Sequence, residues 1–317
     1  MRGILFALLF AVTGAMAQTW PDRPVRILVG YPPGGGTDLV ARLIQQPLSA
    51  KWGQPVVIDN RPGANAIIAT EAVAKAKPDG YTLLMAYATE LAVNPATMKK
   101  LPYDPVKDFA PIVQLASAPL VLAVNPALAA KDVRELVARA KAKPGTLSYS
   151  SSGSGSVHHF AGELFKLQTG ADVLHVPYKG SGPATADAVA GQVQVTYASV
   201  ASVLRFVQAG RLRALAVTSK QRSSQMPEVP SMVEAGLADF ELTSWYGLLA
   251  PAGTPADIIA KIHADVTAAL ASPEQRKSFD AQGLDPASGT PQAFATFIRG
   301  EALKFARIAK AGNINAE

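Results

Sequence analysis

The 317-residue sequence contains no cysteine. Disulfide bonds, thiolate metal sites and thiol nucleophiles are therefore excluded. A lipid anchor on an N-terminal cysteine is excluded as well. A chain without disulfides must be stabilised by its hydrophobic cores, and about 300 residues are enough to bury one or two of them.

Histidine is scarce, and the enzyme motifs that depend on local spacing are absent. The four histidines are His158, His159, His175 and His263, and none lies in His-Glu-x-x-His spacing. No Gly-x-Ser-x-Gly motif occurs either. We therefore expect no metal site, no cofactor and no enzymatic activity. A serine hydrolase using a serine of 150–156 stays open as an alternative, because catalytic triads are defined in space and not by spacing.

The chain also lacks blocks of Lys or Arg, although its formal net charge is +6. A nucleic-acid-binding protein would carry a clustered basic stripe, so no nucleic-acid partner is expected. The mild positive balance suits an anionic ligand. Apart from the N-terminus, charges or prolines interrupt each apolar run, and no run approaches the roughly 20 residues of a membrane-spanning helix.

The N-terminus reads as a signal peptide. Arg2 gives a positive start, Ile4 to Val12 form a short apolar segment, and Ala15-Met16-Ala17 supply a small-x-small cleavage pattern. Cleavage is expected before Gln18, so that residues 1–17 are removed and the mature protein is soluble in the periplasm. The alternative is a buried N-terminal helix.

The rest of the chain alternates between strand and helix patterns, which predicts an α/β fold with helix-covered parallel sheets. The predicted strands are 26–29, 56–58, 81–85, 120–124, 147–150, 173–176, 193–197 and 213–217. The predicted helices are an apolar stripe through 40–48, and 65–76, 132–142, 157–169, 183–190, 200–209, 255–271, 273–282 and 291–311.

The length favours two lobes, because single cores stop growing near 250–300 residues. No flexible linker is present, so the chain should cross between lobes on extended strands. The candidates are Ala116–Val124 and Leu242–Ala250. We expect the first lobe to comprise 18–118 and 226–317 and the second lobe 119–225, with a ligand cleft between them.

A glycine-rich junction follows the first predicted strand. The segment Tyr31-Pro-Pro-Gly-Gly-Gly-Thr-Asp38 ends a strand and starts a helix. Free N–H groups at a helix start form a seat for an anion. A tight turn without a ligand explains the glycines equally well. No lysine follows them, so a phosphate loop is excluded, and the dinucleotide spacing is absent.

A second junction of this kind lies in the other half of the chain. Ser150-Ser-Ser-Gly-Ser-Gly-Ser156 follows a predicted strand and precedes helix 157–169. A third, Val176-Pro-Tyr-Lys-Gly-Ser-Gly182, contains Tyr178. The two donor-rich junctions, one in each lobe, would face each other across the cleft. The alternative for the serine segment is a flexible loop.

Several ordered segments together resemble the Bug family, the substrate-binding proteins of tripartite tricarboxylate transporters. Besides the glycine segment, they are Asn60-Arg-Pro-Gly-Ala64, Lys77-Pro-Asp-Gly-Tyr81, Leu101-Pro-Tyr-Asp104, His175-Val-Pro-Tyr-Lys-Gly180, Pro227-Glu-Val-Pro230 and Ser244-Trp-Tyr-Gly-Leu-Leu-Ala-Pro-Ala-Gly-Thr254. The likeness extends over essentially all of the chain beyond residue 17. It implies a two-lobed α/β fold of the type II periplasmic-binding-protein kind, a small carboxylate ligand and membrane permease subunits as partners.

The resemblance also implies which residues bind ligand. In the first lobe they are Tyr31, Gly35, Gly36, Thr37 and Asp38; in the second lobe they are Ser152, Ser156, His159, Tyr178 and Gly180. For Arg61 we favour a structural role in the turn at Pro62-Gly63, with an ion pair to the ligand as the alternative.

The chain departs from the family pattern at three places. Ala198-Ser199 stands where the family has an aspartate, which removes a possible acceptor. Thr89-Glu90 lies in a loop that is small in the family, and Glu90 would either face the cleft or point to solvent. Asn65 to Ala69 replaces a polar, glycine-rich corner with aliphatic residues, which favours a ligand with an apolar or aromatic portion.

The expected function is capture of a dicarboxylate, tricarboxylate, amino acid or aromatic acid by cleft closure, followed by delivery to the permease. A buried anion needs many donors in place of its water, and both lobes supply them only when the cleft closes. A monomer is expected. A periplasmic sensor for a signalling protein is the main alternative, because it would use the same fold.

Overall fold

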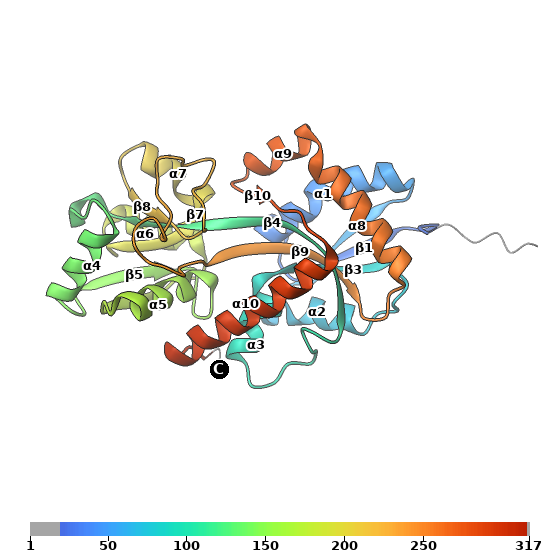
Figure 1. Cartoon of the computed structure of the whole chain (residues 1–317), viewed down its shortest axis with the longest axis horizontal. Coiled ribbons are helices and arrows are strands. Elements are labelled where there is room, and N and C mark those ends of the chain that lie inside the picture. Colours follow the sequence, from blue (N-terminus) through green and yellow to red (C-terminus); the bar gives the residue numbers. More distant parts are fainter. Residues whose placement is uncertain (1–19, 316–317) are drawn as a thin grey trace, which may run out of the picture.

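The computed structural model describes residues 20–315, and the predicted signal peptide, 1–17, lies outside the described residues. Two lobes lie side by side, joined by two long strands that run through the middle of the molecule (Figure 1). In the described range, no helix has both the length and the apolar character needed to cross a membrane.

The first lobe is a mixed sheet with helices on both faces. Its strand order is β2 (Val56–Asn60), β1 (Val25–Val29), β3 (Thr82–Tyr87), β9 (Thr243–Pro251) and the first part of β4 (Phe109–Val124), with the short β10 (Asp285–Pro286) also on β4. Helices α1 (Gly36–Trp52), α8 (Ala256–Ala271) and α9 (Pro273–Asp280) bury apolar side chains on one face. Helices α2 (Ile67–Ala74) and α10 (Pro291–Ala311) do so on the other face.

The second lobe repeats this arrangement on a smaller scale. The last part of β4 pairs with β7 (Val195–Ser199) and β8 (Arg213–Val217), and the sheet continues through β5 (Leu147–Ser151) to β6 (Val173–Pro177). Helices α4 (Val133–Ala142) and α5 (Val157–Thr169) cover one face. Helices α6 (Ser181–Ala190) and α7 (Val200–Gln208) cover the other.

The sheets are less parallel than the alternating pattern predicts. The pairs β1–β2, β1–β3, β5–β6 and β5–β7 are parallel. The strands that pass between lobes run antiparallel to their neighbours, in the pairs β3–β9, β4–β9, β4–β7 and β4–β8. Parallel pairing is required only where a β–α–β unit connects neighbouring strands. The strands that carry the chain between lobes are not part of such units, so each lobe combines parallel and antiparallel pairs.

The change of lobe on β4 occurs at Pro119. β4 pairs with β9 as far as Pro119 opposite Thr243, and Leu120 then pairs with β7 at Ser199. Proline has no N–H to offer a ladder, so it suits the position where one pairing ends. Beyond it, Thr218 hydrogen bonds to Leu120, its Oγ1 accepting from the Leu120 N–H at 2.9 Å and its N–H donating to the Leu120 carbonyl at 2.9 Å.

The segment 226–242 contacts the second lobe, although the sequence assigns it to the first. The Val217 N–H donates to the Pro230 carbonyl at 2.8 Å, and the Met232 N–H donates to the Val217 carbonyl at 2.9 Å. Met226 and Val229 are buried in the same cluster as Val121 and Val217. We therefore propose that the second lobe extends to residue 242 instead of ending at 225.

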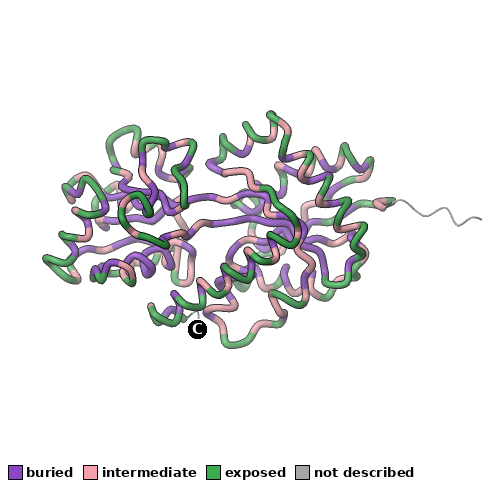
Figure 2. The backbone as a smooth tube through the Cα atoms, in the orientation of Figure 1, coloured by how far each residue is buried: buried purple, intermediate pink, exposed green. Residues whose placement is uncertain are grey.

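Burial is concentrated on the shared strands. β4 and β9 are buried along most of their length, and exposed residues lie mainly on the surrounding helices and loops (Figure 2). Helix α10 belongs to the first lobe but reaches the second, where the rings of Phe305 and Phe160 of α5 lie 4.8 Å apart. Ile314, just beyond α10, is also buried.

Two short helical segments after β2 and β3 differ from the predicted pattern. The predicted helix 65–76 begins as a turn of 3-10 helix, η1 (Ala64–Ala66), in which the residues have positive φ, and continues as α2. The segment after β3 forms a π-helical turn, η2 (Thr89–Val93), followed by α3 (Asn94–Thr97). A third short turn, η3 (Pro126–Leu128), follows β4.

Candidate ligand-binding cleft

The cleft between the lobes is formed by strand–helix junctions. The carboxyl ends of parallel strands are the usual place for a ligand in α/β sheets. A hollow of about 460 Å³ is lined by 31–37, Tyr87 and Tyr246. A second hollow of about 260 Å³ is lined by Tyr31, Asn65, Tyr87 and Thr89 of the first lobe and by 152–158 of the second. Tyr31 and Tyr87 line both hollows, so the two form one cleft.

The glycine-rich junction ends in a helix start without a side-chain cap. Helix α1 begins at Gly36, its N-cap is Gly35, and no side chain caps it. The first N–H groups of a helix have no acceptor within the helix. Because Gly36 and Thr37 line the 460 Å³ hollow, their donors and the positive end of the α1 dipole can serve an anion there.

Asp38 forms hydrogen bonds within this junction and does not line either hollow. Its side chain is only 2% exposed, and it accepts hydrogen bonds from the Gly34 N–H at 2.9 Å, Arg42 Nε at 2.8 Å and Asn60 Nδ2 at 2.9 Å. Burial raises the pKa of Asp38, but these hydrogen bonds outweigh it and hold the pKa below its ordinary value. Asn60 also donates to the Tyr31 carbonyl. The carboxylate is thus occupied by internal donors.

Three tyrosines form the wall beside the helix start. The Tyr31 and Tyr87 ring centroids lie 6.0 Å apart, edge to face, and those of Tyr87 and Tyr246 lie 5.1 Å apart. A Cβ added at Gly36 would lie 2.6 Å from the Tyr246 hydroxyl. Position 36 therefore has room for glycine alone while Tyr246 keeps this position. The wall gives the cleft the aromatic surface that an acid with an apolar portion would contact.

Glu90 lies inside the first lobe, behind the tyrosine wall. The residue is 0% exposed, so it does not point to solvent. Its Oε2 accepts hydrogen bonds from the Tyr31 hydroxyl at 3.4 Å and from the Tyr87 N–H at 3.3 Å. Burial raises the pKa of Glu90 to about 8. Its neighbour Thr89 lines the cleft directly.

The serine–glycine segment forms the opposite wall. Ser152 and Ser156 line the 260 Å³ hollow. Ser156 is the N-cap of α5: its Oγ accepts from the His159 N–H at 3.2 Å and donates to the Gly153 carbonyl at 2.7 Å. The hydrogen bonds within this segment make it an ordered wall and not the flexible loop that its composition also allows.

The two adjacent histidines of α5 have different surroundings. His158 lines the cleft, and its Nδ1 lies 2.6 Å from Ser152 Oγ. The ring of His159 stacks on that of His175, with centroids 3.8 Å apart, and His159 is not among the residues that line either hollow. Its Nδ1 accepts from the Gly155 N–H at 3.1 Å. Burial lowers the pKa of both His158 and His159 to about 4.

The β6–α6 junction supports the serine–glycine segment from behind. The Tyr178 N–H donates to the Ser151 carbonyl at 3.0 Å, and the Gly180 N–H donates to the Ser152 carbonyl at 3.1 Å. The Tyr178 hydroxyl donates to Asp187 at 2.7 Å. Tyr178 and Gly180 do not line either hollow. They contribute to the cleft indirectly, by hydrogen bonding to the serine–glycine segment that lines it.

Ala198 and Ser199 lie at the end of β7, outside both hollows. Ala198 is 1% exposed and packs in the core of the second lobe. Ser199 is the N-cap residue of α7, and its Oγ lies 2.8 Å from Ser202 Oγ. The structure therefore does not bring these two residues to the walls that the other junctions form.

The donors that line the cleft are uncharged. None of the described residues lining the two hollows is a lysine or an arginine. Arg42 pairs with Asp38, and Arg61 pairs with Asp59 at 3.0 Å. Arg61 thus belongs to the turn after β2, as the sequence suggests. An anion in the cleft would be held by N–H and hydroxyl groups and by the α1 dipole.

Outside the predicted segments 31–38 and 150–156, five lining residues were not predicted: Asn65, Tyr87, Val157, His158 and Tyr246. Tyr87 and Tyr246 lie opposite each other in the β3–β9 register. The available signal was position, since Tyr87 lies two residues beyond the predicted strand 81–85 and Asn65 begins the predicted helix 65–76. Tyr246 lies within a continuous apolar strand, where the sequence does not distinguish it from core residues.

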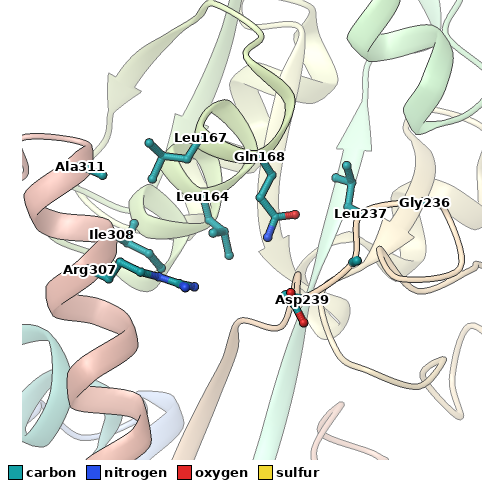
Figure 3. Close-up of a pocket in the computed structure, with 10 residues that line it drawn as sticks. Leu164, Leu167, Gln168, Gly236, Leu237, Asp239, Arg307, Ile308 and Ala311 are labelled. Atoms are coloured by element: carbon teal, nitrogen blue, oxygen red, sulfur yellow. The ribbon is translucent and has the colours of Figure 1, made fainter.

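A further hollow of about 480 Å³ lies between α5, α10 and the loop before β9 (Figure 3). Leu164 and Leu167 of α5, Ile308 of α10 and Leu237 of the loop give it an apolar lining, and Arg307 and Asp239 are exposed at its edges. No strand–helix junction of the cleft contributes to it. The ligand-binding features converge on the cleft and not on this groove.

A two-lobed α/β fold with two crossing strands and a cleft lined by helix starts defines the class of periplasmic binding proteins. The chain belongs to a particular family of this class, because residues 40–314 match the family model described as "Tripartite tricarboxylate transporter family receptor". This confirms the resemblance and the expected fold. The members of this family are solute-binding receptors and not enzymes.

Relatives and solved structures agree with this assignment. The chain is 38% identical to Protein BugT of Bordetella pertussis over 97% of this chain and 95% of that protein. The structure of an R. palustris protein with adipate is 36% identical, with a TM-score of 0.81, over 93% of this chain and 99% of that one. MatC from Rhodopseudomonas palustris, with bound malate, is 32% identical, with a TM-score of 0.76, over 91% and 99%.

Proposed function

We propose that this chain is a periplasmic solute-binding protein that captures a small carboxylate in the cleft and delivers it to the permease of a tripartite tricarboxylate transporter. The observation that carries the proposal is the start of α1, where an uncapped helix end opens into the cleft opposite the serine–glycine segment. Adipate and malate in two similar structures support a dicarboxylate as the ligand class.

The ligand would be bound between the two walls. One acid group accepts hydrogen bonds from the N–H groups of Gly36 and Thr37, and the tyrosine wall contacts the carbon chain. Ser152 and Ser156 of the second lobe add donors when the lobes close. The closed state is favoured because only there do both walls replace the water of the anion.

A thermal-shift panel of adipate, malate, amino acids and aromatic acids tests the proposal. An acid present at about 100 times its dissociation constant should add roughly 2.7 kcal/mol to the free energy of unfolding. Gly36→Val should abolish the shift, because the added side chain meets the Tyr246 hydroxyl and blocks the seat.

Gly300→Val provides the matched control, because Gly300 lies on α10 and a Cβ there meets nothing within 4 Å. It should keep the ligand-induced shift. A panel in which no acid stabilises the protein while a sugar or a cation does would contradict the proposed function. Copurification of the ligand-loaded protein with its permease tests the delivery step.

A further inference from the structure

The carboxyl group of Glu90 lies just beneath the cleft surface without a full set of hydrogen bonds. The donors of other residues that reach it, the Tyr31 hydroxyl and the Tyr87 N–H, both bond to Oε2, and its own backbone N–H also favours the ionised form. Oε1 is buried, and no donor among the described residues reaches it. An ionised carboxylate with one oxygen unpaired inside a protein is strongly disfavoured, whereas the protonated form needs fewer donors.

The groups around Glu90 do not offer a balancing positive charge. Four tyrosine hydroxyls are close enough to interact electrostatically with Glu90: those of Tyr31, Tyr87, Tyr103 and Tyr246. Burial raises the pKa of each of them, and the charge of Glu90 raises each further, so they remain neutral in mildly alkaline solution. None of the groups that shift the pKa of Glu90 is a cation.

Helix α10 also packs against η2, the turn that carries Glu90. Its buried carboxyl, Glu301, has partners of its own: it pairs with Lys304 and accepts a hydrogen bond from Trp245 Nε1 at 3.2 Å. Lys304 is thus engaged by Glu301, and it also donates to the Glu241 carbonyl at 2.9 Å. Both carboxyls are therefore buried, but Glu301 pairs with a lysine, whereas no cation pairs with Glu90 among the described residues.

A single layer of phenol rings separates Glu90 from the seat at α1. Tyr31 and Tyr87, which bond to Oε2, both line the hollow that contains Gly36. The Tyr87 ring lies 5.1 Å from that of Tyr246, whose hydroxyl borders Gly36. At such short range in a poorly solvated region, a charge on Glu90 and a charge on a bound acid interact strongly.

We propose that Glu90 is a proton-carrying specificity residue of this seat: it holds a proton when a carboxylate is bound, and in its ionised form it rejects that ligand. The inference rests on the proposed function, since it concerns the same seat. An acid group enters next to a neutral Glu90, and ligand and proton bind together.

The direction of the pH dependence follows from linkage. Below about pH 8, Glu90 is already protonated in the free protein, so ligand binding takes up almost no proton. Above that pH the free protein has lost the proton, and a bound anion restores it. Uptake should approach about one proton per ligand by pH 9, and affinity should fall by up to about tenfold per pH unit.

The test is calorimetric titration with adipate and with malate at pH 7 and pH 9, each in two buffers of different ionisation enthalpy. The wild-type protein should take up a proton at pH 9 and bind more weakly there than at pH 7. Glu90→Gln should bind with the same affinity at both pH values, because its amide cannot ionise. Glu301→Gln, the matched change in the paired buried carboxyl, should keep the wild-type pH profile.

The outcomes separate this inference from the proposed function. If no carboxylate binds at either pH, the proposed function fails. If a carboxylate binds without proton uptake at pH 9, and wild type and Glu90→Gln share one pH profile, the role of Glu90 is overturned and carboxylate binding stands. Should Glu90→Gln fail to fold, the remaining titrations still test the inference: absence of proton uptake by the wild-type protein at pH 9 overturns the role of Glu90, and uptake that Glu301→Gln retains supports it.

Discussion

At the scale of single residues, Asp38 shows how a charged residue within a binding junction can serve the junction itself. The sequence places Asp38 with the ligand-binding residues, since it follows the glycines directly. In the structure its carboxylate accepts from the Gly34 N–H, Arg42 and Asn60. These hydrogen bonds hold the bend that precedes Gly36 and Thr37, which line the cleft.

Asp38→Asn should lower the free energy of unfolding by about 2 kcal/mol at pH 7, because one of the charged acceptor oxygens becomes an NH₂ group facing donors. The lowered pKa of Asp38 fixes the sign of the pH dependence. Its stabilisation is fully present above the ordinary value of 3.8 and is lost as pH falls through the lowered value. The gap between wild type and variant, measured by urea unfolding, should therefore narrow below about pH 4.

Asp257→Asn is the control for this measurement, because Asp257 is an exposed residue in the first turn of α8. A surface charge at a helix start contributes about 0.5 kcal/mol. A pH-independent difference between wild type and Asp38→Asn, or equal effects at both positions, would contradict the role given to Asp38.

For some residues the sequence does not determine which side chain lines the cleft and which is buried. His158 and His159 occupy the first turn of the same helix, and their order in the chain does not say which one lines the cleft. In the structure His159 contacts His175 and the Gly155 N–H, and His158 lines the cleft. Glu90 is a similar case, because a charged residue is expected at the surface unless packing encloses it.

At the scale of elements, hydrophobic periodicity and turn residues predicted most strands and helices well. The strand at 147–150 and the helices at 157–169 and 291–311 correspond closely to β5, α5 and α10. The segment 88–97 was not predicted, because a π-helical turn has no periodic pattern of its own. The antiparallel pairing of β4 and β9 was not predicted either, since it depends on how chain segments far apart in sequence meet.

A buried side-chain hydroxyl is hydrogen-bonded at the point where β4 passes from one lobe to the other. Thr218 is 0% exposed, and its Oγ1 accepts from the Leu120 N–H directly after Pro119. Thr218→Val keeps the shape but leaves that N–H without its acceptor, which should cost about 1–3 kcal/mol in the free energy of unfolding. Thr218→Ser keeps the hydroxyl and should retain the hydrogen bond. Equal melting temperatures for wild type and Thr218→Val would show that the hydrogen bond contributes nothing to stability.

At the scale of the whole molecule, the cleft is divided between two bodies. Gly36, Thr37 and the tyrosine wall belong to the first lobe, and the serine–glycine segment belongs to the second. Under the proposed function, donors from both walls replace the water of the anion, so we expect ligand binding to bring the lobes together. We expect the movement to occur about the crossing strands at Pro119 and Thr243, where β4 changes from one lobe to the other.

Small-angle X-ray scattering should detect this approach as a smaller radius of gyration in the presence of a saturating acid from the thermal-shift panel. Thr37→Val removes a hydroxyl beside the helix start and should require more ligand for the same decrease. Thr296→Val, an equivalent change on the exposed surface of α10, should behave as wild type. An unchanged radius at saturation would contradict closure.

The route of the chain through β4 and β9 also bears on how the protein is made. The second lobe draws its strands from one continuous stretch, from the end of β4 to β8, whereas the sheet of the first lobe lacks its fourth strand until residues 243–251 have been synthesised. During translation all strands of the second lobe are therefore synthesised before the first lobe has all of its own. Until then the sheet of the first lobe has an unpaired edge, the kind of exposed surface that chaperones protect.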